Sequence, residues 1–136
     1  MLQAYSTNID INENIAIPFN NIVVDKGCAE ALLAPASIQL NQRGVYLVEV
    51  DGFGTGAAAA EGTVQLYING VPQAQAISSF TTAAATISNF GFKTFVRVAE
   101  NNCPCNCISS PTTLQVFNGA AALTEGHINI VVTKIR

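Results

Sequence analysis

Tryptophan is absent from this sequence, histidine and methionine occur once each, and charged residues are scarce. Asp, Glu, Lys and Arg together make up 11% of the 136 residues, whereas about 25% is usual for a soluble domain. A surface with so few charges must consist of uncharged polar and small side chains, or be buried partly against other copies of the chain. The first alternative is a monomer rich in small residues. We favour the second, an oligomer.

Long apolar runs are also absent. No run reaches the roughly 18 residues of a transmembrane helix, and the first ten residues lack the basic and apolar regions of a secretory signal. The net charge is −3, and the six basic residues are dispersed along the chain. These features predict no membrane and no nucleic-acid partner. The length and the lack of a linker predict one domain, residues 1–136.

Short β-branched and aromatic runs, separated by turn residues, occupy most of the chain. Apolar and polar side chains alternate strictly around Val48, Leu66, Val96 and Ile130, which predicts strands with one buried face in an all-β antiparallel sandwich. We expect ten strands, near 3–6, 15–19, 21–25, 36–41, 44–53, 62–69, 73–81, 89–99, 112–118 and 126–135. The stretch 28–37, CAEALLAPAS, is the one helix candidate. Because it is short and Pro35 would end it, we expect a loop with one helical turn.

Sites of catalysis or cofactor binding are not indicated. Gly52, Gly54 and Ala57 match a dinucleotide-binding fingerprint, but Gly62 leaves no room for the helix that must follow. We interpret 52–62 as a flexible loop between strands. His127 is the single histidine, and no nucleophile-elbow motif accompanies it. We therefore expect a structural or exposed His127, no enzyme activity and no cofactor.

Three of the four cysteines, Cys103, Cys105 and Cys107, lie within five positions, and Cys28 is remote. Single-residue gaps fit neither the paired spacing of zinc ligands nor a C-x-x-C redox motif. Pro104 favours an extended Cys103, so a Cys103–Cys105 bridge would have to span about 6.6 Å, near the limit of about 6.8 Å. We expect a disulfide between Cys103 and Cys107, or from Cys28 to one of the three. The bond would lie within a subunit or between subunits. Free thiols and a bound metal remain alternatives.

Four segments together resemble a known family: IAIPFNNIVV, SIQLNQRGVYLVEVDG, GTVQLYINGVPQ and HINIVVTKI. They are similar to the C-terminal domain of the collagen-like glycoprotein of the bacterial spore exosporium, a member of the tumour necrosis factor and complement-head superfamily. The resemblance covers about residues 4–135. It implies a ten-stranded jelly-roll sandwich, a tight homotrimer and a structural or adhesive role without an active site. The collagen-like G-X-Y stalk of such relatives is absent from this chain, and the cysteine cluster is not part of the family pattern.

The resulting hypothesis is a non-enzymatic homotrimer on the exterior of a bacterial assembly, at a virion surface or a spore surface. We favour a phage virion, as a capsid decoration or fibre head, with a capsid protein as partner. One alternative is an exosporium layer protein with a spore-surface partner. Another is a module that binds a host-surface glycan or protein through loops 52–62 and 99–111. Tyr67, Phe95 and Phe117 point outward from their strands and are the predicted trimer-interface residues.

Overall fold

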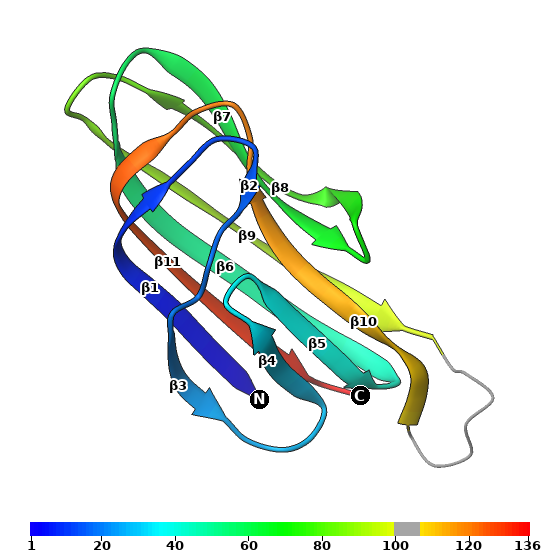
Figure 1. The fold of residues 1–136 in the computed structure, drawn as a ribbon. Coiled ribbons are helices and arrows are strands. Elements are labelled where there is room, and N and C mark those ends of the chain that lie inside the picture. The colour runs from blue at the N-terminus through cyan, green and yellow to red at the C-terminus, as the bar shows by residue number, and fades with distance from the viewer. Residues whose placement is uncertain (100–106) are drawn as a thin grey trace.

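The computed structural model describes residues 1–99 and 107–136, which form two antiparallel β-sheets packed face to face (Figure 1). Eleven strands lie within these residues. Their bounds are β1 Leu2–Ile11, β2 Ile15–Ala16, β3 Asn21–Asp25, β4 Glu30–Ala34, β5 Ser37–Gln42, β6 Gly44–Gly56, β7 Ala60–Ile68, β8 Val71–Thr82, β9 Ile87–Val98, β10 Cys107–Asn118 and β11 Leu123–Lys134. The all-β antiparallel sandwich expected from the sequence is confirmed.

The strands are shared between a five-stranded sheet and a six-stranded sheet. The order in the five-stranded sheet is β3-β1-β11-β6-β9. The order in the six-stranded sheet is β4-β5-β10-β7-β8, and β2 joins it by pairing with β10. The first long strand, β1, pairs with the last, β11, so Leu2 lies opposite Val132. Both ends of the chain therefore lie at the same end of the sandwich (Figure 1).

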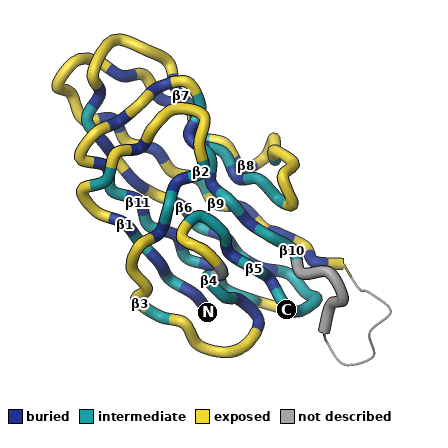
Figure 2. The backbone as a smooth tube through the Cα atoms, viewed as in Figure 1, coloured by how far each residue is buried: buried dark blue, intermediate teal, exposed yellow. Residues whose placement is uncertain are grey.

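The core lies between the two sheets and follows the alternation of the sequence. Val48 and Ile130 from the five-stranded sheet, and Val64 and Leu66 from the six-stranded sheet, are all fully buried. In Figure 2, buried and more exposed residues alternate along the long strands. Removing an aliphatic side chain of this size from water contributes about 1.5–3 kcal/mol. The period-two pattern thus sets which face of each strand points inward.

The expected helical turn at 28–37 is wrong, because β4 occupies Glu30–Ala34 and pairs antiparallel with β5. Pro35 and Ala36 form the turn of this hairpin instead of ending a helix. The segment is rich in good helix formers, but tertiary pairing overrides such local preferences. Strand β4 raises the number of strands from the expected ten to eleven in the described residues.

The expected flexible loop at 52–62 is also wrong. Strand β6 continues to Gly56 and β7 begins at Ala60, so only a short connection separates them. A Cβ atom on Gly52 would lie 2.6 Å from Cζ of Phe90, and one on Gly62 would lie 2.6 Å from Cζ of Phe80. These two glycines therefore make room for aromatic rings of the core, which explains their presence without a nucleotide.

Two buried polar side chains connect the sheets near the ends of the chain. Glu30 of β4 is 2% exposed, and its Oε1 accepts a hydrogen bond of 3.0 Å from the backbone N–H of Lys134 in β11. Its Oε2 lies 3.0 Å from the amino group of Met1. Tyr46 of β6 is fully buried and donates its hydroxyl to the carbonyl of Gln42 at 2.7 Å. Burial raises the pKa of Tyr46 to about 12.

Candidate interaction surfaces

The outer face of the five-stranded sheet exposes large apolar side chains. Ile87 and Phe95 project from β9, and their exposed fractions are 62% and 63%. Phe53 of β6 is also exposed and stacks on His127 of β11, with ring centroids 5.2 Å apart and planes within 13°. Alternation places these residues on the face opposite the core. Phe95 also lines a small hollow together with Val45 and Ile135, so apolar side chains are grouped around it. Grouped exposed apolar side chains mark sites of protein–protein contact.

A polar band crosses the same face. Lys93 and Glu49 form an ion pair of 3.4 Å between β9 and β6, and their side chains are 69% and 41% exposed. The amide of Asn129 donates to Asp51 at 3.2 Å and its Oδ1 accepts from Gln3 at 3.1 Å. An exposed ion pair contributes little to stability, typically about 0–1 kcal/mol. Polar groups in such a band give specificity of contact more than affinity.

The outer face of the six-stranded sheet has a different character. Tyr67 of β7 and Phe117 of β10 pack against each other with ring centroids 4.3 Å apart, and both are partly buried. Tyr67, Phe95 and Phe117 all point outward, as expected from the sequence. The fold nevertheless separates them, because Phe95 lies on the other sheet.

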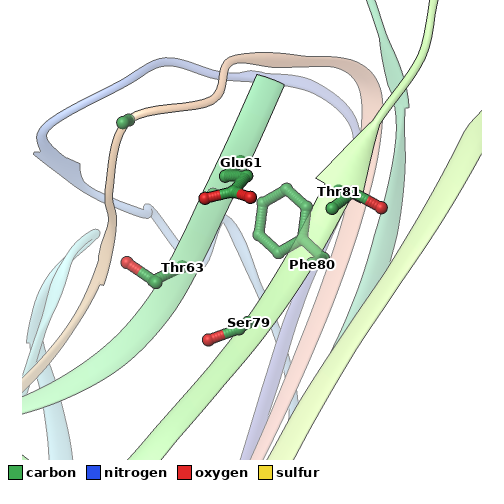
Figure 3. A pocket seen from close by; sticks show the side chains of 7 residues that line it. Glu61, Thr63, Ser79, Phe80 and Thr81 are labelled. Atoms are coloured by element: carbon green, nitrogen blue, oxygen red, sulfur yellow. The ribbon is translucent and has the colours of Figure 1, made fainter. Parts of the chain in front are cut away.

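Two hollows lie side by side along β7 on this face. The first has a volume of about 620 Å³ and is lined by Glu61, Thr63, Ser79, Phe80 and Thr81, with Gly62 and Ala120 (Figure 3). The second, of about 210 Å³, is lined by Asn14, Thr63, Gln65, Tyr67, Phe117, Asn118 and Gly119. Thr63 borders both hollows. No feature of the sequence alone signalled them, since they depend on how β7, β8 and the turn after β10 meet.

Four of the six basic residues gather at the end of the sandwich near the chain ends. Arg43, Arg97, Lys134 and Arg136 line a hollow of about 490 Å³ together with Gly44, Val45 and Val98. They are dispersed in the sequence, so periodicity gave no indication of this cluster. Lys134 donates from Nζ to Oε1 of Gln42 at 3.1 Å. The hollow is a cationic feature that composition alone does not reveal.

The cysteines are only partly within the described residues. Cys28 precedes β4, is exposed and forms no disulfide within the described residues, and its Sγ accepts a hydrogen bond of 3.1 Å from Nε2 of Gln42. Cys103 and Cys105 lie outside the described residues, and for Cys107 only the backbone is described, paired with Gln42. The disulfide expected at Cys103–Cys107, or from Cys28 to this cluster, therefore stays a prediction.

Groups for metal binding do not converge in the described part of the chain. Among residues 1–99 and 107–136, no three side chains of His, Cys, Asp or Glu lie close enough to hold a metal ion. His127 stacks on Phe53, as noted above, and lies on a strand surface. In the same residues the structure contains no helix of the length and apolarity needed to cross a membrane.

No protein-family model and no curated protein matches the sequence. Solved structures match over nearly its whole length. The globular domain of zebrafish complement 1qA protein has a TM-score of 0.70 at 9% identity, covering 99% of this chain and 96% of that one. The PRD1 vertex protein P5 has a TM-score of 0.65 at 16% identity, covering 99% and 96%. The Eiger TNF from S. frugiperda has a TM-score of 0.66 at 12% identity, covering 99% and 92%.

The fold is the TNF/C1q-like jelly roll. At identities of 9% to 16% the similarity concerns the fold alone. The jelly roll expected from the resemblance is thereby confirmed. Function has to be argued from the surfaces, because one fold serves many functions.

Proposed function

We propose that this chain is a non-enzymatic structural protein whose homotrimer decorates or builds the exterior of a bacterial assembly, namely a phage virion. Its role there is that of a capsid decoration or a fibre head. The observation that carries this proposal is the match of nearly the whole chain to the PRD1 vertex protein P5, at a TM-score of 0.65. A vertex protein is a structural component of a particle, so the same fold has a structural role in that neighbour.

Self-association is supported by the outer face of the five-stranded sheet. Ile87 and Phe95 each leave more than half of their side chains exposed on β9, an edge strand of that sheet. With 11% charged residues, the chain has few charges elsewhere to offset this apolar area. A closed ring of three copies would bury it in each protomer, because one patch meets a different patch of the next protomer around the ring.

A spore-surface layer is the second candidate. It is favoured by the sequence resemblance to the exosporium glycoprotein domain, through segments such as 44–53 and 62–72. In both candidates the partner is a protein of the particle surface, and the trimer is the displayed unit. The two differ in the particle and not in the chemistry of this chain.

Two measurements test the proposal. Light scattering of the purified protein at micromolar concentration should give three times the chain mass of 14.3 kDa; a single chain mass contradicts the trimer. Antibody labelling in electron micrographs should then mark the outside of phage particles. Labelling of spores alone supports the second candidate, and a diffuse label inside cells contradicts both.

A further inference from the structure

The two hollows along β7 share Thr63 as a border, and together we call them the β7 groove, defined by Glu61, Thr63, Gln65 and Tyr67. We propose that this groove binds an uncharged oligosaccharide, with one sugar ring against the Tyr67–Phe117 pair and further hydroxyls held towards Glu61. This inference is independent of the proposed homotrimer, because the whole groove belongs to a single chain.

The wide end of the groove is a square of polar side chains. Glu61 lies opposite Thr81, and Thr63 lies opposite Ser79, in the β7–β8 register. Residues two apart on a strand share a face, so all four side chains belong to the same outer surface; Figure 3 shows Glu61, Thr63 and Ser79 around the hollow. Its volume of about 620 Å³ lies within the range of about 300–1,000 Å³ that is typical of small-molecule sites.

The narrow end of the groove supplies an aromatic platform. Tyr67 and Phe117 pack with their ring planes tilted by 37°, so they present a joint apolar surface. The C–H face of a pyranose is apolar and packs on such rings, while its hydroxyls seek polar groups at the ring edge. Gln65 lies between the platform and the wide end, and its Nε2 is held by the carbonyl of Gln73 at 3.0 Å. That bond orients the Gln65 carbonyl oxygen as an acceptor.

The wall between the two ends is fixed by backbone hydrogen bonds. Gly119 donates its N–H to the carbonyl of Thr63 at 2.6 Å, and Asn14 donates its N–H to the carbonyl of Gly119 at 3.0 Å. The buried Asn118 connects the neighbouring turns, because its Nδ2 donates to the carbonyls of Asn12 and Ala121 at 2.9 and 2.7 Å. A Cβ on Gly119 would collide with Oγ1 of Thr63. Glycine therefore keeps the junction open, and a preformed site of this kind loses little entropy on binding.

The charge of the groove selects its ligand. None of the described residues that line the two hollows is Lys or Arg, and Glu61 is the single acidic one. A sialylated or phosphorylated glycan would place its negative charge near the Glu61 carboxylate, and no Lys or Arg that the structure describes lines the groove to offset the repulsion. This repulsion would lower the affinity for such a glycan. Hydroxyls of a neutral sugar can instead donate to the Glu61 carboxylate in charge-assisted hydrogen bonds. An added peptide strand would use the free backbone edge of β8, not this side-chain face.

The test is binding of the whole protein to immobilised oligosaccharides. The probes are neutral oligomers of glucose, galactose and N-acetylglucosamine, with sialylated oligosaccharides of the same cores for comparison. We expect binding to at least one neutral series and at least tenfold weaker binding to its sialylated counterpart. Tyr67→Ala and Glu61→Gln should each weaken binding at least tenfold.

Gln65→Ala and Gln75→Ala form a matched pair. Gln75 lies exposed on β8 and lines neither hollow, so Gln75→Ala should bind as the wild type does, whereas Gln65→Ala should bind more weakly. Glu61 is exposed, so Glu61→Gln tests the groove even if Tyr67→Ala fails to fold. The proposal is overturned if no neutral series binds, if sialylated probes bind better, or if Gln65→Ala and Gln75→Ala bind alike. If the protein is a trimer but binds no glycan, this inference is overturned and the proposed homotrimer stands. If the protein binds glycan as a monomer, the proposed homotrimer is overturned and this inference stands.

Discussion

The outer faces of the two sheets hold their aromatic and aliphatic side chains in different ways. On the five-stranded sheet, Phe95 and Ile87 leave 63% and 62% of their surface exposed, and Phe95 is grouped with Val45 and Ile135. On the six-stranded sheet, Tyr67 and Phe117 cover each other and are surrounded by uncharged polar groups such as Gln65. The first arrangement leaves apolar surface that another protein can bury. The second is already packed and leaves a hollow beside it, which suits a small polar ligand.

The edge strands continue this contrast. Every outward residue of β9 from Ile87 to Arg97 is exposed. On β8 the outward residues are mainly Gln, Ser and Thr, and the apolar exceptions Val71 and Ile77 are separated along the strand. Isolated exposed apolar residues are normal on protein surfaces, whereas Phe95 on the five-stranded sheet is grouped with Val45 and Ile135. The five-stranded sheet is therefore the face on which assembly is expected, and the six-stranded sheet is expected to remain open.

The largest expected effect comes from placing a charge on the β9 face. Ile87→Glu and Phe95→Glu should each convert the trimer to single chains, because an unpaired carboxylate buried at an interface is strongly unfavourable. Light scattering should show the mass fall threefold at micromolar concentration. Circular dichroism should still show a β-sheet protein, since both side chains point away from the core.

Ile77→Glu is the matched control on the other sheet. Ile77 is 42% exposed on β8, so the same substitution is made at an exposed isoleucine of an edge strand. We expect its trimer to persist. If Ile77→Glu dissociates the protein and Ile87→Glu does not, the interface lies on the six-stranded sheet with Tyr67 and Phe117. The comparison of the two faces would then be reversed.

Much of the sandwich follows from the sequence because period-two alternation reports directly which side chains point inward. The pattern around Val48, Leu66, Val96 and Ile130 gave correct inward faces for β6, β7, β9 and β11. Strand β4 was missed because Glu30–Ala34 consists of good helix formers. Its state is set by pairing with β5 and by a buried carboxylate whose partner, Lys134, is 104 residues away.

The surface features were harder to predict from the sequence than the fold was. Alternation showed that Tyr67, Phe95 and Phe117 point outward, but it carries no information on which strands are neighbours. The partition of these residues between two sheets, and the groove beside Tyr67, arise from long-range strand pairing. The gathering of four basic residues at one end has the same origin. Local sequence patterns predict which side of a strand each side chain lies on, whereas the residues that meet in a site depend on the strand topology.

A second prediction concerns the link that Glu30 makes between the two sheets. Glu30→Ala removes a buried carboxylate that accepts from the partly buried N–H of Lys134, which should cost about 1–3 kcal/mol in the free energy of unfolding. Glu49→Ala removes an exposed partner of Lys93 and should cost at most about 1 kcal/mol. Urea unfolding at one fixed protein concentration measures both, because the stability of an oligomer depends on concentration. Equal costs for the two variants would show that the Glu30 link contributes nothing beyond an exposed ion pair.

The smallest effect at neutral pH is expected at Tyr46, the second link between the sheets. Burial raises the pKa of Tyr46 to about 12, whereas an unfolded tyrosine ionises near 10. The folded state thus holds the proton more tightly, so this contribution to stability is complete below about pH 10. It is lost as the pH rises from about 10 to 12, and the full loss is about 3 kcal/mol, from two pKa units at 1.36 kcal/mol each.

The variant Tyr46→Phe has no ionisable hydroxyl, so its free energy of unfolding should fall less steeply than that of the wild type between pH 9.5 and 11.5. At pH 7 the variant should be less stable by about 1 kcal/mol, because it loses the hydrogen bond to Gln42. Urea unfolding of both proteins at several pH values in this range measures the difference. Parallel curves would mean that Tyr46 is no less hydrated in the folded protein than in the unfolded chain. A shallower curve for the variant would show that the Tyr46 hydroxyl is buried between the sheets in the folded protein.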